Sequence, residues 1–353
     1  MTWLITGGCG FVGTNLADAL FREGEDVVLL DNLSRVGSRD NLSWLRSQHG
    51  EDWLFVEADI RNPSVLARLV EERKPCALAH LAGQVAMTTS IQNPRFDFEV
   101  NALGTLNVLE SVRQYSPATI VLYSSTNKVY GSLDYLRYQE SETRYILPDY
   151  PDGFDENLPL DGHSPYGCSK LAAEQYVRDY HRIYDIPTVV FRHSSIYGGR
   201  QFSSIDQGWI GWFCMKSLEM GETDAPAFTI CGNGKQVRDV LHADDLVKVY
   251  FEAFEQIHRT SGNVYNIGGG QTNSLSLLEL FDTLERLTHN RMRFQKLEWR
   301  IGDQKFFIAN TGLAAQHFGW KPAVEKEKGL AAMLEWCREL GTRKTVDGSW
   351  SPR

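Results

Sequence analysis

Residues 6–13, which read TGGCGFVG, decide the fold of this chain. They follow a short apolar run at 3–5 and precede an amphipathic stretch at 11–23. A strand, a glycine-rich turn and a helix in this order are the context of a dinucleotide-binding loop. The three spaced glycines let the chain turn with positive φ, let backbone approach a pyrophosphate and let the helix pack on the strand. The pyrophosphate would lie at the helix N-terminus, which favours anions; a tight βα turn without a ligand is the alternative.

A carboxylate strengthens the dinucleotide interpretation. A second apolar run, at 27–30, ends in Asp31, about twenty residues after the loop. An acid there accepts hydrogen bonds from both hydroxyls of an adenosine ribose and repels a 2′-phosphate, so it predicts NAD rather than NADP. Arg35 lies close by and could soften that preference.

Composition excludes several classes of function. The chain has 353 residues, of which 42% are hydrophobic and 23% charged, with a net charge of −9. It has no basic stripe for nucleic acid and no apolar run of membrane length, so we expect neither partner. The six cysteines show no CxxC pair and no metal-ligand spacing, so we expect reduced thiols in the cytoplasm and no metal site.

The first half of the chain alternates between two kinds of segment. Strand-like apolar runs occur at 3–5, 27–30, 54–56, 77–81, 119–123 and 188–191, and helix-like segments at 11–23, 63–73, 96–115 and 166–185. Such alternation predicts an α/β fold with a Rossmann-like, doubly wound parallel sheet covered by helices on both faces. Ligands of these sheets bind beyond the carboxyl ends of the strands.

Several expected strands end in polar residues. Asp59 could accept from an adenine amino group or cap the helix that starts near Pro63. His80 is more simply a packed histidine than a catalyst. The hydroxyl run at 124–126 would be costly to bury unpaired, so we expect it to line a site. The long tyrosine-rich segment at 132–164 could be a lid, a substrate wall or a subunit contact.

Tyr166 and Lys170 are four residues apart at the start of an expected helix, so they share one helix face. Lowering the pKa of a tyrosine from about 10 to about 7, where it could act as a base, requires about 4 kcal/mol. One exposed ammonium supplies only about 1 kcal/mol, so a partly dry site with Lys170 and a cationic nicotinamide would have to supply the rest. An ordinary surface pair is the alternative.

Together these motifs resemble the extended short-chain dehydrogenase/reductase family, which contains NAD-dependent epimerases and dehydratases of nucleotide sugars. The resemblance covers residues 1 to about 340. It implies that Thr126, Tyr166 and Lys170 are catalytic, with Tyr166 as acid/base and Lys170 holding the nicotinamide ribose. Asn101 matches the asparagine that usually stands behind the active-site helix.

The second half of the chain is similar to the same family. In the stretch 228–242, FTICGNGKQVRDVLH, Arg238 occupies the place of an arginine that binds the diphosphate through a bidentate fork. Arg300 and Asp303 resemble a second diphosphate arginine and a ribose-binding acid; surface salt bridges are the alternative for both arginines. The run at 264–268 resembles a strand that returns to the sheet.

This resemblance implies two domains. We expect a NAD-binding Rossmann domain at 1–191 and 236–267, a smaller α/β substrate domain for the nucleotide sugar at 192–235 and 268–340, and a polar, frayed tail at 341–353. Relatives are homodimers or homotetramers, so we expect a homo-oligomer here, with association through the helices at 96–115 and 166–185.

Two positions narrow the choice within the family. Asn127 and Lys128 stand where 4,6-dehydratases carry an Asp-Glu pair, and neither can act as that acid and base. The segment at 192–195 has serine where UDP-galactose 4-epimerases usually have asparagine. Stretches that resemble family members acting on carbon 2 of CDP-linked hexoses occur at 83–90, 124–131, 132–164, 191–195 and 206–213.

The expected reaction is therefore inversion at carbon 2 of a CDP-hexose, with CDP-glucose as another candidate, through a transient 2-keto sugar and tightly bound NAD. The alternatives are a UDP-sugar 4-epimerase or another nucleotide-sugar epimerase, and a non-enzymatic NAD-binding regulator. The intact Thr126, Tyr166 and Lys170 argue against the regulator.

Carried over residue by residue, the resemblance predicts two binding sets. The expected NAD-binding residues are Gly7, Gly10, Phe11, Val12, Asp31, Asn32, Ser34, Arg35, Asp59, Ile60, Leu81, Ala82, Gln84, Asn101, Ser124, Tyr166, Lys170 and His193. The expected substrate-binding residues are Thr88, Ser90, Thr126, Asn127, Lys128, Ser195, Arg200, Gln207, Arg238, Arg300 and Asp303.

Overall fold

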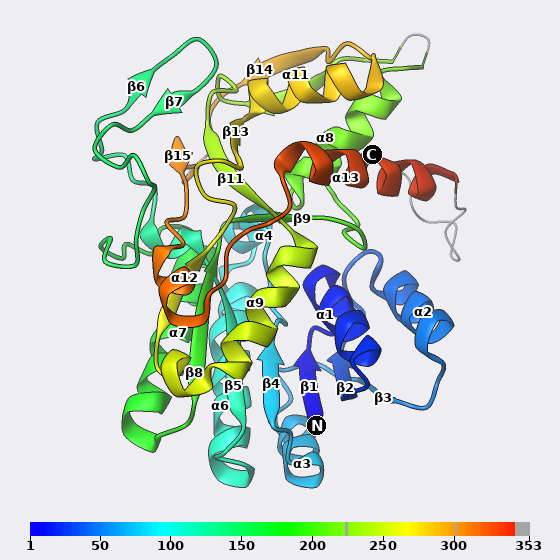
Figure 1. The fold of residues 1–353 in the computed structure, drawn as a ribbon, viewed down its shortest axis with the longest axis vertical. Helices are drawn as coiled ribbons and strands as arrows, with labels where there is room; N and C mark the ends of the chain where they lie inside the picture. The colour runs from blue at the N-terminus through cyan, green and yellow to red at the C-terminus, as the bar shows by residue number, and fades with distance from the viewer. Residues whose placement is uncertain (223–224, 301, 343–353) are drawn as a thin grey trace.

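A seven-stranded parallel sheet forms the centre of the protein, which we describe from a computed structural model covering residues 1–222, 225–300 and 302–342 (Figure 1). The strand order is β12-β8-β5-β4-β1-β2-β3. The strands are β1 (Thr2–Thr6), β2 (Asp26–Asp31), β3 (Leu54–Glu57), β4 (Ala77–His80), β5 (Ile120–Thr126), β8 (Thr188–His193) and β12 (Val264–Ile267). The order turns back between β1 and β4, as in a doubly wound sheet, which confirms the expected fold class.

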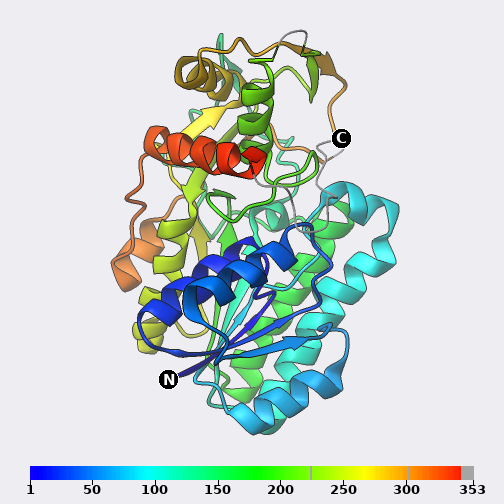
Figure 2. The same ribbon diagram turned by 90° about the vertical axis from the view of Figure 1, so that its right-hand side faces the viewer.

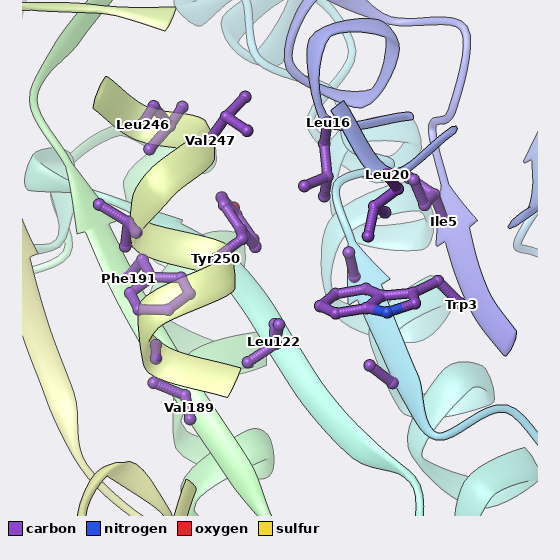
Figure 3. Close-up of a cluster of buried hydrophobic side chains, with 14 of the residues drawn as sticks. Trp3, Ile5, Leu16, Leu20, Leu122, Val189, Phe191, Leu246, Val247 and Tyr250 are labelled. Atoms are coloured by element: carbon purple, nitrogen blue, oxygen red, sulfur yellow. The ribbon is translucent and has the colours of Figure 1, made fainter. Parts of the chain in front are cut away.

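Both faces of this sheet are buried, which explains its continuous apolar strands. In β1, Trp3 and Ile5 point into one hydrophobic cluster, and Leu4 between them points into another on the opposite face. This follows from the two-residue period of a strand. Figure 3 shows the first cluster, where Tyr250 and Phe191 pack beside Leu122.

Helices cover the two faces. On the first face lie α1 (Phe11–Arg22), α2 (Ser38–His49), α9 (Ala243–Glu255), α10 (Ile257–Thr260) and α12 (Gly312–Phe318). On the second lie α3 (Pro63–Arg73), α5 (Pro94–Phe98), α6 (Gly104–Tyr115) and α7 (Ser164–Tyr184). Figure 2 shows the darker blue helices α1 and α2 on one side of the sheet, and the light-blue α3 with the cyan and green helices on the other. The sequence prediction named no helix for α2, whose composition is mostly polar, nor for α9, α10 and α12, which come from the second half of the chain.

One expected helix is not continuous. The segment predicted at 96–115 consists of α5, a π-helical turn η1 (Glu99–Leu103) and α6. A π turn widens the helix locally, a change often found at functional sites. Here it contains Asn101, which is buried against the loop after β4.

The rest of the chain forms a smaller α/β region above the carboxyl ends of the sheet (Figure 1). Its strands are β9 (Ser195–Tyr197), β10 (Phe228–Cys231), β11 (Val237–His242), β13 (Ser274–Ser276), β14 (Phe294–Leu297) and β15 (Phe306–Phe307). Its helices are α8 (Trp209–Glu219), α11 (Leu277–Thr288) and α13 (Lys326–Thr342), which share a separate apolar core. A capping box between Ser276 and Glu279 starts α11.

The tyrosine-rich segment forms a hairpin of β6 (Gln139–Glu140) and β7 (Tyr145–Ile146) that projects from the smaller region (Figure 1). Arg144 holds it there through a fork on Glu279, with a shortest distance of 2.6 Å. Further along, Phe154 is fully buried and its N–H donates to the carbonyl of Ile308. The segment is thus packed on the smaller region for much of its length.

The chain ends differ from the expectation. The predicted tail began at 341, but α13 continues to Thr342. Residues 343–353, the rest of that tail, lie outside the described residues. No helix in the described part of the chain is both long and apolar enough to cross a bilayer.

A buried ion pair connects α7 to the sheet. Arg192 in β8 donates to Glu174 in α7, with a shortest distance of 2.5 Å, and both side chains are almost fully enclosed. Ser125 donates to the same carboxylate, and Tyr130 accepts from the guanidinium at 2.7 Å. Burying two charges is costly, and good geometry with further hydrogen bonds offsets that cost.

We expect Glu174→Gln to lower the free energy of unfolding by about 3–5 kcal/mol, because it leaves the guanidinium of Arg192 buried without its counter-charge. The shift of the urea midpoint measures this. The control is Asp282→Asn, which removes an exposed partner of Arg286 on α11 and should change stability by less than about 0.5 kcal/mol. Equal midpoints for the two variants would contradict this account.

Candidate active site

A cavity of about 550 Å³ opens at the carboxyl ends of β1, β2, β4, β5 and β8. This is where a doubly wound sheet binds its ligands. Of the residues predicted to bind NAD, those that line it are Gly7, Gly10, Phe11, Val12, Asp31, Asn32, Ser34, Arg35, Asp59, Ile60, Leu81, Ala82, Gln84, Ser124, Tyr166 and His193. Asn101 and Lys170 are buried behind its wall.

The glycine turn leaves no room for side chains. Gly7 has φ +71°, and a Cβ there would fall 2.7 Å from the backbone nitrogen of Ala82. A Cβ on Gly13 would fall 2.2 Å from the carbonyl oxygen of Gly7. Helix α1 has no side-chain cap and no acid in its first turn, so its first N–H groups are left for an anion. The turn therefore fits a pyrophosphate.

Asp31 ends β2 in the position that the sequence predicted. One carboxylate oxygen accepts from the N–H of Leu33 at 2.8 Å and the other from the N–H of Cys9 at 3.0 Å. Burial raises the pKa of Asp31, and these two hydrogen bonds oppose that rise. Each oxygen retains acceptor capacity for a ribose hydroxyl.

The two alternatives for Asp59 can now be compared. Asn62, not Asp59, caps α3, because its side chain accepts from the N–H of Ser64. The capping alternative is therefore wrong. A fork from Arg61 lowers the pKa of Asp59 to about 2, and Asn32 also donates to it. This network lies at the rim of the cavity.

Two buried histidines flank the site. His80 is packed between Thr6 and Thr105, at 2.7 and 3.0 Å, as expected of a structural histidine. His193 lies 3.2 Å from the hydroxyl of Ser124, whereas its Nε2 is buried without a protein partner. Burial holds the pKa of both histidines at about 3, so both are neutral. The unpaired Nε2 on the cavity wall fits a polar ligand.

The predicted catalytic residues converge. Thr126 ends β5 and Tyr166 lies in the first turn of α7, and both side chains line the cavity. One turn later, the Nζ of Lys170 donates to the carbonyl of Ser124 at 2.5 Å and lies 4.4 Å from the ring centre of Tyr123. These contacts place a hydroxyl, a phenol and an ammonium at one end of the cavity.

Burial dominates the electrostatics of this group. It raises the pKa of Tyr166 to about 12, and the neighbouring hydroxyl of Thr126 opposes that rise. The lowering that a base near pH 7 needs was predicted to require a cationic nicotinamide as well, and it stays a prediction. Burial lowers the pKa of Lys170 to about 7, against the fields of Asp97 and Glu174. The cause is that desolvation disfavours the charged form of both groups.

A network that the sequence analysis largely missed supports α7. Asn101 donates to the carbonyl of Gln84 and to the hydroxyl of Ser169, both at 3.0 Å. Ser169 in turn donates to Asp97 at 2.5 Å. Sequence spacing could have indicated this network, because Asp97 lies one helical turn before Asn101 and Ser169 is next to Lys170.

Some predicted substrate residues form a second polar group. Arg238 donates to Asp303 at 2.7 Å, and Lys128 lies 3.7 Å from the same oxygen. Burial lowers the pKa of Lys128 to about 8. Asn127 donates to the buried amide of Gln304 at 3.1 Å. Arg238, which was expected to bind the diphosphate, thus lies beside Asp303, the acid that the sequence analysis had grouped with Arg300.

The other predicted substrate residues are spread more widely. Thr126, Ser195, Arg200 and Gln207 line the cavity, whereas Thr88, Ser90, Asn127, Lys128, Arg238, Arg300 and Asp303 do not. Thr88 and Ser90 lie on α4 (Met87–Gln92), and the hydroxyl of Thr88 is buried without a protein partner. Arg300 is exposed and reaches the sulfur of Cys231 at 3.4 Å.

Arg200 has an unexpected environment. Its guanidinium lies 4.1 Å from the ring centre of Trp44 in α2 and 4.3 Å from that of Trp336 in α13. Its carbonyl accepts from Asn41 at 3.2 Å. These contacts join the two halves of the molecule at the cavity wall.

No group of three or more potential metal ligands occurs in the part of the chain that the structure describes.

Comparison with known proteins identifies the family. Residues 4–333 match the model of the family described as GDP-mannose 4,6 dehydratase. The chain belongs to this family of extended short-chain dehydrogenases/reductases.

Individual relatives are epimerases and dehydratases. CDP-paratose 2-epimerase of Salmonella typhi is 53% identical over 340 residues, which cover 96% of this chain and 100% of that protein. A putative UDP-glucose 4-epimerase of Methanocaldococcus jannaschii is 32% identical, over 95% of this chain and 98% of that protein.

Solved structures agree with these matches. UDP-glucose 4-epimerase of Thermotoga maritima with UDP-glucose has a TM-score of 0.81 at 28% identity, covering 96% of this chain and 99% of that one. UDP-glucuronic acid 4-epimerase of Bacillus cereus, in complex with UDP-glucuronic acid and NAD, has a TM-score of 0.80 at 25% identity, covering 96% of this chain and 100% of that one.

We expect Asp31→Asn to reduce NAD bound to the purified protein at least about tenfold. One of the two backbone N–H donors would then face an amide NH₂. The variant would also lose a charge-assisted hydrogen bond to the ribose, which is worth about 1.5–3 kcal/mol. Cofactor released by denaturation and measured by absorbance reports the result. Asp26→Asn, at the exposed start of β2, is the control. Full NAD content in Asp31→Asn would remove Asp31 from the cofactor site.

Proposed function

We propose that this protein is a nucleotide-sugar epimerase that inverts carbon 2 of a CDP-linked hexose, in a reaction of the type that converts CDP-paratose to CDP-tyvelose. The observation that carries the proposal is the 53% identity to CDP-paratose 2-epimerase over that protein's whole length. CDP-glucose is a further candidate substrate. Thr126, Tyr166 and Lys170 would carry out the reaction. Asn127 and Lys128 occupy the positions of the acid pair that dehydration needs, and neither can replace it.

The cofactor is NAD. Gly7, Gly10 and the first turn of α1 would hold its pyrophosphate, and Asp31 the adenosine ribose. When bound, NAD supplies a hydride acceptor and then a hydride donor at carbon 2 of the sugar. In this proposal residues 1–191 and 236–267 bind the cofactor, and 192–235 and 268–340 bind the nucleotide sugar.

The protein's own groups act on the proton and the developing charge. Thr126 donates to the oxygen at carbon 2, a preorganised dipole that is most effective in a dry site. Tyr166 takes the hydroxyl proton and later returns it. Because burial raises the pKa of this phenol to about 12, the positive charge of Lys170 one turn away is needed to stabilise the phenolate.

Substrate binding would use the second polar group. Arg238 suits a diphosphate because its guanidinium presents a planar fork of donors. Asp303, now paired with Arg238, fixes the orientation of that fork. Holding the diphosphate while the sugar turns lets the second face of the 2-keto sugar be reduced without release.

A UDP-sugar 4-epimerase is the second candidate, favoured by the 32% identity to a putative UDP-glucose 4-epimerase. It would use the same three residues at another carbon. A regulator that binds NAD without turnover is the alternative from another class.

We further propose a homodimer or homotetramer in the cytoplasm. Apolar side chains on the outer surface of the α5–η1–α6–α7 layer would form the contact: Phe98, Leu103, Tyr176, Ile183 and Tyr184. Large apolar groups that gather on one face commonly mark interfaces. All six cysteines are free, which fits a reducing compartment.

We expect Tyr166→Phe to reduce the epimerisation rate about 10²- to 10⁴-fold, because it removes the group that exchanges the hydroxyl proton. Initial rates measured with saturating substrate test this. Tyr135→Phe, in the exposed part of the hairpin segment, is the control and should retain the normal rate. A Tyr166→Phe protein with near-full activity would exclude Tyr166 from the mechanism.

The proposed function is tested by NMR of the protein in heavy water, without added NAD, against CDP-, UDP- and GDP-linked sugars. We expect inversion at carbon 2 of a CDP-sugar with protium retained at that carbon. Inversion at carbon 4 would favour the second candidate. Deuterium at carbon 2 would falsify the internal oxidation and reduction, and no turnover of any sugar with NAD bound would favour the regulator.

A further inference from the structure

A fully buried carboxylate, Asp97, lies behind the helix that carries Tyr166 and Lys170. It belongs to α5, one turn before the π-helical segment with Asn101. None of the roles assigned above uses it. A buried charge is costly unless hydrogen bonds or an opposite charge compensate it.

Every hydrogen bond that Asp97 accepts in the structure comes from a neutral side chain. One carboxylate oxygen accepts from the amide nitrogen of Gln84 at 2.7 Å and from that of Asn101 at 3.3 Å. The other accepts from the hydroxyl of Ser169 at 2.5 Å. Burial raises the pKa of Asp97, and these three donors and the charge of Lys170 oppose that rise. The donors favour the ionised form of the acid but bring no opposite charge.

The second carboxylate near Lys170 is in a different situation. Glu174 lies one turn further along α7 and accepts a fork from Arg192 and a hydrogen bond from Ser125. Most of its charge is therefore neutralised by the guanidinium. Its field on Lys170 is also smaller than that of Asp97.

The remaining groups that face Lys170 do not supply negative charge. Tyr123 presents the face of its ring, and its phenol stays neutral because burial raises its pKa. His80 in β4 and His193 in β8 are both neutral. Tyr166 is protonated in this environment. Of the described groups around the ammonium, Asp97 thus provides the largest uncompensated negative field.

We propose that Asp97 is the counter-charge of Lys170 and a positioning residue of the reaction, acting through Lys170 and Ser169 rather than on the sugar. Its charge keeps the buried ammonium protonated, and its bond to Ser169 fixes the turn of α7 between Tyr166 and Lys170. The catalytic part of this role rests on the proposed function, whereas the charge coupling does not.

The test is Asp97→Asn, which keeps the size of the side chain and removes the charge. With lysines carrying ¹³C at Cε, NMR titration of the holoenzyme follows the ammonium of Lys170, identified by its absence in Lys170→Met. Burial already lowers the pKa of Lys170 to about 7, and Asp97 opposes that lowering. Its removal should therefore lower this pKa by a further unit or so.

Two controls separate charge from structure. Asp179→Asn removes an exposed carboxylate from the same helix and should leave the pKa of Lys170 unchanged. Ser169→Ala removes the hydrogen bond to Asp97 but keeps the charge, so it should also leave that pKa nearly unchanged. An unchanged Lys170 pKa in Asp97→Asn, or an equal shift in Ser169→Ala, would overturn the charge coupling.

Activity gives a second readout. Asp97 also raises the pKa of Tyr166, so both limbs of the kcat/KM profile against pH should move to lower pH in Asp97→Asn. A purely structural loss would lower the profile without moving it, and that outcome would overturn the positioning role. Failure of the proposed function would remove the profile while leaving the Lys170 titration intact.

If Asp97→Asn does not fold, the reciprocal measurement replaces it. Coupling between two titrating groups is symmetric, so Lys170→Met should raise the pKa of Asp97 by about as much as Asp97→Asn lowers that of Lys170. Aspartate labelled with ¹³C at Cγ reports this change. An unchanged Asp97 pKa would overturn the proposal.

Discussion

The arrangement of the site depends on the fork between Arg192 and Glu174. It joins the middle of α7 to the sheet, next to the strand ends where Ser125 and Thr126 face the cavity. Because α7 also carries Tyr166 and Lys170, this ion pair helps to hold these two side chains beside Thr126 at the end of β5. A hydrophobic contact could supply similar stability, but it would not fix the rotation of the helix as two directed hydrogen bonds do.

Burial controls the chemistry as much as geometry does. The same desolvation that raises the pKa of Tyr166 to about 12 lowers that of Lys170 to about 7, so the two values move apart. Forming the charged phenolate and ammonium together therefore costs more free energy in this site than in water. The enclosed site also strengthens each dipole aimed at the substrate oxygen. The low polarity that makes Tyr166 a poor acid in isolation therefore strengthens the electrostatic effect of the neighbouring groups on the substrate oxygen.

Local patterns predicted much of this fold, and long-range contacts account for what they did not predict. The glycine turn, Asp31 and the Tyr166–Lys170 spacing are encoded within a few residues, where the geometry of a turn or a helix applies directly. The cap at Asn62, the π turn at Asn101 and the hydrogen bond from Arg238 to Asp303 depend on which partner is available. The burial of Tyr166, which raises its pKa to about 12, also depends on long-range packing and could not be predicted from spacing.

Arg200 contacts both halves of the molecule. Its guanidinium is stacked between an indole of α2 and an indole of α13, beside the cavity that the cofactor would fill. Opening that side of the cavity requires at least one of these stacks to separate, and each is worth about 0.5–2 kcal/mol depending on its exposure. Release of a bound dinucleotide through that side would then require α13 to move away from α2. A firmly held wall would suit the proposed reaction, in which NAD is regenerated in every cycle and need not leave.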